Sequence, residues 1–255
     1  MYKLMITDLD MTLLDSNKNL SEYTEKFIKE KLNVPLIAAT GRSLIEAKTF
    51  LKSVRAKYII AANGAVIYDC ESEKIIYEKC ISKEKCIKVY KLLKSDAVKV
   101  YSSLNKCFRD SELDVFISSI NDIEDKIYKI GVGFENKDDY TEYKLRLDEL
   151  NLVNMCIEHP YKSGYYMEIS PEESDKVNAI RYIADLCHID IKDMVAFGDG
   201  TNDVGMLKEV GLGVAMKNAM EGALEVSDDV TENTNDEDGV AKYIEEKLGE
   251  KLCIR

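Results

Sequence analysis

The sequence predicts an α/β protein whose core is a parallel sheet and whose middle forms a second, inserted α+β domain. Short apolar runs alternate with helix-like segments near the start of the chain and again near its end. This alternation is typical of strands joined by helices in a parallel sheet. The segment between these two parts has a different order of elements and many charged residues and tyrosines, which indicates a separate domain.

The first part of the chain supplies strand, helix, strand, helix and strand in that order. We expect strands over 3–7, 34–39 and 58–62, a helix over 21–32 and a second helix from Ser43 onward. Glu46 follows Ser43 by three residues, which is the spacing of a capping box at a helix start. The last part repeats the pattern with a helix over 176–186 and strands over 194–197 and 212–215.

The middle of the chain predicts the inserted domain. Its expected helices cover 86–93, 112–119 and 139–150, and its expected strands cover 98–102, 127–134 and 154–158. We place the inserted domain at 82–164, so that 1–81 and 165–255 together form the discontinuous core.

Charge and hydropathy exclude several classes of partner. The 255 residues include 35 Lys and Arg against 47 Asp and Glu, for a formal net charge of −12. Proteins that bind nucleic acids or anionic membranes need a cationic surface, so neither is an expected partner. No apolar run is long enough to cross a bilayer, and the start of the chain lacks the pattern of a signal peptide. We expect a cytoplasmic protein, and the sequence leaves its oligomeric state open.

The cysteines and histidines narrow the metal chemistry. The seven cysteines form no C-x-x-C pair, and the chain has two histidines. These features argue against a disulfide framework, a structural zinc site and a histidine-rich metal site. Any metal is therefore expected to be a hard cation held by carboxylates.

Two acidic motifs follow strands of the expected sheet. Asp8 and Asp10 belong to the run D-L-D-M-T after the first strand, and Asp199 and Asp203 belong to G-D-G-T-N-D after a later one. The carboxyl ends of parallel strands meet at one edge of a sheet, where such sheets bind ligands. Neighbouring carboxylates repel each other unless a cation such as Mg²⁺ lies between them. A turn with helix caps is the plain structural alternative for either motif taken alone.

Groups that can hold an anion are expected beside these carboxylates. Thr40 and Gly41 end the second strand and offer a hydroxyl and backbone N–H groups, while Lys176 opens a helix. The helix dipole disfavours a lysine in the first turn, so we expect a functional partner for Lys176 such as a phosphate. Taken alone, Lys176 would be read as an ordinary surface lysine.

The chain contains, in this order, the motifs D-x-D-x-T, T-G-R, the helix-opening lysine and G-D-G-x-N-D. This set of motifs resembles that of the haloacid dehalogenase superfamily of phosphotransferases, and the resemblance covers the whole chain. Within this superfamily the chain resembles the Cof-type branch, subfamily IIB. The features that carry this resemblance are the insert, the run Asn63-Gly64-Ala65, and two tail segments, Asn218-Ala219 and 238–241 (D-G-V-A). The resemblance implies a Rossmann-like core and an α+β cap domain. It also implies a Mg²⁺-dependent phosphatase, a phosphoric monoester hydrolase, that acts on a small phosphorylated metabolite.

The resemblance further implies a role for each motif residue. Asp8 would attack phosphorus to form an aspartyl-phosphate intermediate, and Asp10 would act first as general acid and then as general base. Mg²⁺ would be held by the carboxylates of Asp8 and Asp199 and the backbone carbonyl of Asp10, with Asp203 binding it directly or standing behind the ligands. The residues that would bind the phosphoryl group are Thr40, Gly41, Lys176 and Asn202.

Other positions are weaker candidates or depart from the family pattern. Met11 and Val177 stand where glycine is common, and Leu224 stands where a lysine is usual. Arg42 is expected either to contact the substrate phosphate or to brace the loop, and Asn63 is a similar candidate. The lesser candidates for substrate contact are His159, Lys162, Tyr165 and Tyr166, whereas His188 is expected to interact with the dipole of the helix that it ends.

Two further functions remain open from the sequence. A phosphomutase would use the same aspartates but return the phosphoryl group to a sugar instead of to water. The second is a metabolite-binding regulator without catalytic activity, because Met11 and Leu224 depart from the family pattern. The sequence argues against a receiver-type signalling module, because such a module would be about half as long and would lack the insert. Sugar phosphates, pyridoxal phosphate and nucleotide-like esters are all compatible substrates.

Overall fold

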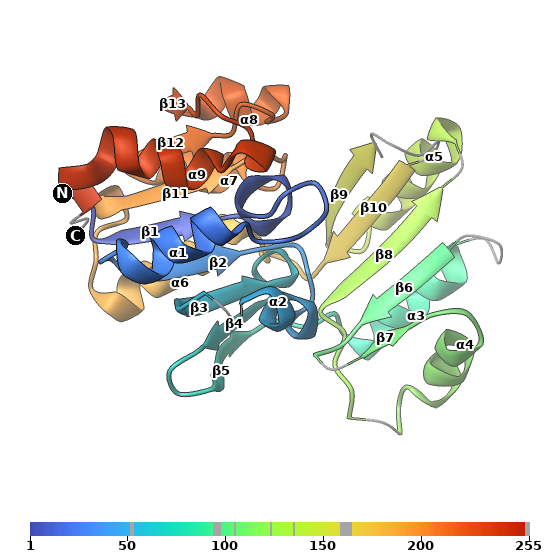
Figure 1. Ribbon diagram of the computed structural model, residues 1–255. Helices are drawn as coiled ribbons and strands as arrows, with labels where there is room; N and C mark the ends of the chain where they lie inside the picture. Colours follow the sequence, from blue (N-terminus) through green and yellow to red (C-terminus); the bar gives the residue numbers. More distant parts are fainter. Residues whose placement is uncertain are drawn as a thin grey trace. The chain divides into compact units, whose positions relative to one another are not determined.

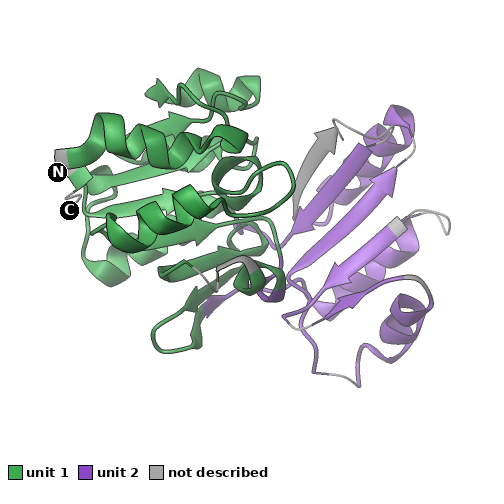
Figure 2. Ribbon diagram, viewed as in Figure 1, with its two compact units in different colours: residues 1–42, 46–76, 175–255 green, residues 43–45, 77–174 purple. Residues whose placement is uncertain are grey.

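The computed structural model describes residues 1–51, 54–93, 98–104, 106–122, 124–134, 136–158 and 165–252. These residues divide into two compact units, which are described separately (Figure 2). Unit 1 contains Met1–Arg42, Glu46–Ile76 and Asp175–Arg255, and unit 2 contains Ser43–Ile45 and Tyr77–Ser174.

Unit 1 is built on a sheet with the strand order β13-β12-β11-β1-β2-β3-β4-β5 (Figure 1). Its strands are β1 (Leu4–Thr7), β2 (Leu36–Ala39), β3 (Ala56–Ala61), β4 (Val66–Asp69), β5 (Lys74–Glu78), β11 (Met194–Gly198), β12 (Leu212–Ala215) and β13 (Asp229–Val230). The strands from β13 to β3 pair in parallel, while β4 pairs antiparallel with β3. The expected α/β fold with a parallel core is therefore confirmed.

Helices lie on both faces of this sheet, with α1 and α9 on one face and α6 on the other (Figure 1). They are α1 (Glu22–Glu30), α2 (Leu44–Leu51), α6 (Lys176–Cys187), α7 (Val204–Glu209), α8 (Glu221–Val226) and α9 (Gly239–Tyr243). Shorter helical turns are η1 (Leu9–Leu13), η2 (Ala62–Gly64), η3 (Ile191–Asp193), η4 (Asn235–Glu237), η5 (Ile244–Leu248) and η6 (Gly249–Leu252). Because both faces are covered, the residues of β1 and β2 are all buried, which explains their continuous apolar sequence.

Unit 2 is an antiparallel sheet, in the order β7-β6-β8-β10-β9, with helices packed on it. The strands are β6 (Val98–Ser102), β7 (Cys107–Phe108), β8 (Lys129–Phe134), β9 (Val153–Glu158) and β10 (Tyr165–Ser170), and the helices are α3 (Lys83–Leu92), α4 (Asp110–Ser119) and α5 (Lys137–Asp148). Its hydrophobic core joins Val89 of α3, Phe116 of α4 and Leu147 of α5 to Ile130 and Met167 of the sheet.

The bounds of unit 2 differ from the inserted domain expected over 82–164. Residues 165–170 were assigned to the second part of the core, but they form β10, which pairs with β8 on one side and β9 on the other. Its residues Met167 and Ile169 are fully buried in the core of unit 2. This burial and the hydrogen bonds of two neighbouring strands hold β10 in the sheet of unit 2, which extends to Ser174.

None of the helices in the described part of the chain has the length and apolar composition that crossing a lipid bilayer requires.

Candidate active site

The carboxyl ends of three neighbouring strands of unit 1 carry the sequence motifs. Thr7 of β1 pairs with Phe197 of β11 on one side and with Ala38 of β2 on the other. The N–H group of Asp8 donates to the carbonyl of Phe197 at 2.9 Å, which continues the parallel ladder one residue beyond β1. The residues that follow β1, β2 and β11 therefore meet at one edge of the sheet, as expected.

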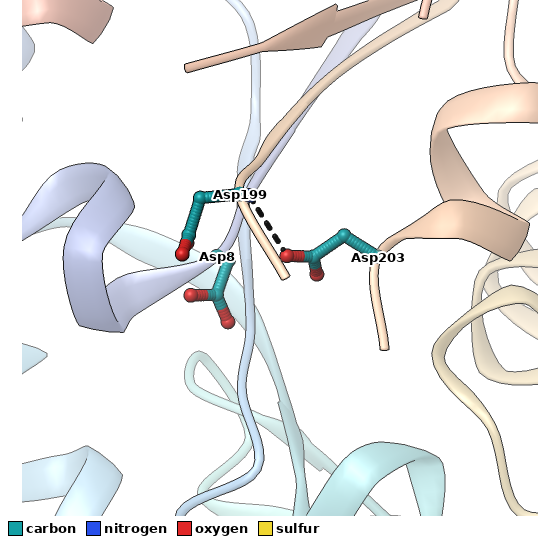
Figure 3. Close-up of side chains that lie close together, drawn as sticks. All are labelled: Asp8, Asp199 and Asp203. Carbon is teal, nitrogen blue, oxygen red and sulfur yellow. Dashed lines mark hydrogen bonds between the residues drawn. The ribbon is translucent and has the colours of Figure 1, made fainter. Parts of the chain in front are cut away.

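Three aspartates converge at this edge (Figure 3). One carboxylate oxygen each from Asp8, Asp199 and Asp203 lies within 4.8 Å of the other two. Asp8 and Asp203 are 5% and 0% exposed, and Asp199 is partly buried. Burying several carboxylates together carries a large desolvation cost unless positive charge offsets it.

Lys176 supplies one positive charge to this aspartate triad. Its Nζ lies 2.5 Å from Asp8 Oδ1 and 2.6 Å from Asp203 Oδ1, and the side chain is 1% exposed. Burial alone would lower the pKa of Lys176, but the carboxylates of Asp203 and Asp8 outweigh burial and raise it. The functional partners of this unusual lysine at a helix start are thus the two carboxylates, which keep its amine charged.

A tight loop after β11 fixes Asp203. Its Oδ2 accepts the backbone N–H groups of Asp199 at 3.0 Å and Gly200 at 2.9 Å. A Cβ atom at Gly198 would lie 2.6 Å from Cγ of Asp203. Glycine is therefore required at this position for the Asp203 side chain to fold back onto the loop.

The charges of the triad are not balanced. Burial raises the pKa of Asp8 well above its ordinary value despite the nearby Lys176. Burial and the Asp203 carboxylate raise the pKa of Asp199 to about 7, although the hydroxyl of Thr12 donates to its Oδ1 at 2.7 Å and opposes the rise. Three oxygen ligands with a deficit of positive charge have the chemistry of a site for a hard divalent cation.

The carboxylate of Asp10 points to a different partner. Arg42 Nε donates to Asp10 Oδ2 at 2.7 Å, and Nη2 of the same guanidinium contacts Oδ1, so the pair is bidentate. Of the two roles expected for Arg42, this geometry supports bracing of the loop. The Asp10 side chain is 42% exposed and therefore open to solvent.

The turn after β2 holds the remaining phosphate candidates. Thr40 is fully buried; its hydroxyl accepts the N–H group of Arg42 at 3.1 Å, and its carbonyl accepts the N–H group of Asn63 at 3.0 Å. Gly41 lies between Thr40 and Arg42 in this turn. Asn202 Nδ2 donates to Asn63 Oδ1 at 3.1 Å, so these two candidates are also brought together.

Other sequence candidates lie elsewhere. Tyr165 and Tyr166 belong to β10 of unit 2, and His159 and Lys162 lie outside the described residues. The positive φ of His188, 52°, marks the end of α6. Leu224 is 38% exposed on α8 and brings no cation to the acidic loop.

Three contacts of the site were not assigned from the sequence. The first is the Thr12 hydroxyl on Asp199, although Thr12 belongs to the D-x-D-x-T motif. The others are Asn218 Nδ2, which donates to the carbonyl of Met11 at 2.8 Å, and Asn235 Nδ2, which donates to the carbonyl of Leu14 at 3.0 Å. Asn218 was noted as part of a resemblance, whereas Asn235 was not singled out, and nothing in the sequence around either residue shows what it contacts.

Fold and site together define an α/β protein whose parallel sheet carries a cluster of three aspartates suited to a divalent cation. Comparison with known proteins gives the family. Residues 5–244 match the family model described as haloacid dehalogenase-like hydrolase. The 5-amino-6-(5-phospho-D-ribitylamino)uracil phosphatase YcsE of Bacillus subtilis is 30% identical over 246 residues, which cover 95% of this chain and 94% of that protein. The chain belongs to the haloacid dehalogenase-like hydrolase family.

Solved structures agree with this assignment. A haloacid dehalogenase-like hydrolase from Bacteroides thetaiotaomicron superposes with a TM-score of 0.80 at 25% identity, over 96% of this chain and 99% of that chain. A sugar phosphatase of HAD subclass IIB shares the fold with a TM-score of 0.75 at 19% identity, over 95% of this chain and 98% of that chain. The family model and the phosphatase relatives confirm the expected membership of the Cof-type branch and the expected enzyme class, a phosphoric monoester hydrolase.

Proposed function

We propose that the protein is a Mg²⁺-dependent phosphatase that hydrolyses a small phosphorylated metabolite through an aspartyl-phosphate intermediate. The observation that carries the proposal is the Asp8 carboxylate. It is buried at the end of β1, 2.5 Å from the Lys176 ammonium, in a triad suited to a divalent cation. A nucleophile held against fixed positive charge is what phosphoryl transfer needs, because the reaction depends on alignment and charge neutralisation.

The metal ligands we propose are the carboxylates of Asp8 and Asp199 and the backbone carbonyl of Asp10, with Asp203 as a further ligand or directly behind them. The charge deficit of the triad supports this assignment. When bound, Mg²⁺ would offset negative charge on the phosphoryl oxygens and allow the carboxylates to be ionised together. Lys176, Thr40, Gly41 and Asn202 would hold the remaining phosphoryl oxygens.

In the first step, an Asp8 carboxylate oxygen forms a bond to phosphorus as the bond from phosphorus to the ester oxygen breaks. The electron pair goes to the leaving oxygen, which takes a proton from the Asp10 carboxyl group. In the second step, Asp10 takes a proton from water as the water oxygen attacks phosphorus. The bond between phosphorus and Asp8 then breaks, which releases phosphate and restores the carboxylate.

The bidentate pair with Arg42 sets a condition on this cycle. Both oxygens of the Asp10 carboxylate accept hydrogen bonds from the Arg42 guanidinium. The pair must therefore open before the Asp10 carboxyl group can face the leaving oxygen. The exposure of Asp10 leaves room for this movement.

The candidate substrates are small phosphate esters. By its name, the relative YcsE acts on 5-amino-6-(5-phospho-D-ribitylamino)uracil, which is a phosphorylated ribityl chain on a pyrimidine. We include this compound among the candidates with sugar phosphates, pyridoxal phosphate and nucleotide-like esters. We assign unit 2 the role of the cap that selects among them.

Replacement of Asp8 tests the proposal. Asp8→Asn keeps the shape of the side chain but removes the nucleophile, so hydrolysis of 4-nitrophenyl phosphate should disappear. EDTA should abolish it reversibly in the parent protein. A matched control is Asp193→Asn, which changes an exposed partner of Lys3 and should leave the rate unchanged.

The outcomes separate the candidate functions. Turnover retained by Asp8→Asn would refute the mechanism. A parent protein inactive on a broad panel of phosphate esters would indicate a metabolite-binding regulator. Formation of a sugar bisphosphate from a sugar phosphate would indicate a phosphomutase.

A further inference from the structure

The turn that carries Asp10 has a backbone conformation that its own sequence disfavours. Within η1, Asp10 has φ −72° and ψ 129°, and Met11 has φ 60° and ψ 8°. These values are close to those of the two central residues of a type II turn. The second central position favours glycine because its φ is positive, and a residue with a Cβ is strained there. The conformation of Met11 must therefore be held by other parts of the protein.

Two asparagines far along the chain brace this turn. Asn218 Nδ2 donates to the carbonyl of Met11 at 2.8 Å, and Asn235 Nδ2 donates to the carbonyl of Leu14 at 3.0 Å. The asparagines are joined to each other, because the N–H group of Asn235 donates to Asn218 Oδ1 at 3.0 Å. Both ends of the Asn218 amide are thus used, one on the turn and one on its neighbour.

The brace is itself held in place. Asn235 is 6% exposed and begins η4, where Thr234 and Glu237 form a capping box. The backbone of Asn235 is therefore fixed in a position from which its side-chain amide can donate to the carbonyl of Leu14. The Asp10 side chain is held separately by Arg42, so different elements hold its backbone and its carboxylate.

We propose that Asn218 and Asn235 are positioning residues that hold the turn around Met11, so that the Asp10 carboxyl group is presented to the leaving oxygen. This inference rests on the proposed function, in which Asp10 protonates that oxygen. It assigns the asparagines no contact with the substrate. Their loss should slow proton donation without weakening the binding of the phosphate ester.

The test compares two esters of similar shape that differ in their need for a proton. Phenyl phosphate has a more basic leaving group than 4-nitrophenyl phosphate, so its hydrolysis depends more on the general acid. The ratio kcat/KM reports the transfer of the phosphoryl group to Asp8, the step in which Asp10 is the acid. At saturating Mg²⁺, Asn218→Ala should lower kcat/KM for phenyl phosphate about tenfold, which corresponds to about 1.4 kcal/mol. It should lower kcat/KM for the nitrophenyl ester by less than about threefold.

A second substitution tests the link to Met11. Glycine adopts a positive φ without strain, so adding Met11→Gly to Asn218→Ala should restore most of the lost rate on phenyl phosphate. The matched control is Asn136→Ala in unit 2, where the asparagine also donates and accepts one hydrogen bond each, with Asp139. This control should keep the parental ratio of the two rates.

The possible results are distinct. Equal losses on both esters in Asn218→Ala would show a general loss of structure and overturn the positioning role. Failure of Met11→Gly to restore the rate would overturn it as well. A parent protein that hydrolyses neither ester would instead contradict the proposed function.

Discussion

Replacing Asp199 by asparagine in the metal-free protein removes a partly buried carboxyl group whose pKa is raised to about 7, chiefly by desolvation and by the Asp203 carboxylate. In the unfolded chain, the pKa of an aspartate is about 3.9. Between these two values the folded protein holds a proton that the unfolded chain has lost. The free energy of unfolding therefore falls as the pH rises through this interval. Asparagine does not titrate, so the variant should lack this fall.

The size of the effect follows from the width of the interval. From pH 5 to the pKa near 7 there are about two pH units, each worth about 1.4 kcal/mol. Between pH 5 and pH 8, the parent should therefore lose about 3 kcal/mol more unfolding free energy than Asp199→Asn does. The asparagine can still accept the Thr12 hydroxyl through Oδ1, so this contact is preserved.

Urea denaturation in EDTA, followed by far-UV circular dichroism because the chain has no tryptophan, measures this difference. Asp193→Asn is the control and should follow the parent at both pH values. Parallel pH dependences for Asp199→Asn and the parent would refute the reasoning. Adding Mg²⁺ at pH 8 should raise the stability of the parent and have little effect on the variant.

Three further substitutions probe the site and its scaffold. Gly198→Ala places a Cβ 2.6 Å from Asp203 Cγ, so calorimetric titration should show weaker Mg²⁺ binding; unchanged affinity would contradict the steric argument. Lys176→Met leaves Asp8 and Asp203 without their cation and should lower kcat by on the order of 100-fold or more in steady-state assays, and a rate near the parental value would contradict its role. Gly64→Ala puts a Cβ 2.1 Å from the carbonyl oxygen of Asp175 at φ 103°. It should destabilise the protein by about 2 kcal/mol, and an unchanged melting temperature would contradict the strain.

The parallel core could be predicted because strands buried on both faces leave continuous apolar runs, as in β1 and β2. β5 escaped prediction because its residues are at most half-buried and give no such run, and β7 has only two residues. No strand was expected over 165–170, and these residues were assigned to the core by position alone. A short segment does not state which sheet it joins, and the burial of Met167 and Ile169 in unit 2 decides that question.

The aspartates could be expected at one place because parallel strand ends share an edge of the sheet, and Lys176 was placed beside them by its position in the set of motifs. The partner of each side chain could not be predicted in the same way. Lys176 was expected to need a functional partner such as a phosphate, and it contacts two carboxylates. The brace of Met11 by Asn218 depends on a loop after β12 folding back to η1, which no local pattern encodes.

The covalent step at Asp8 is the central claim, and mass spectrometry of acid-quenched enzyme tests it most directly. During turnover of 4-nitrophenyl phosphate with Mg²⁺, the peptide that contains Asp8 should carry the added mass of one phosphoryl group. The adduct should be absent from Asp8→Asn. Rapid turnover with no adduct on this peptide, or an adduct on a different residue, would contradict the account.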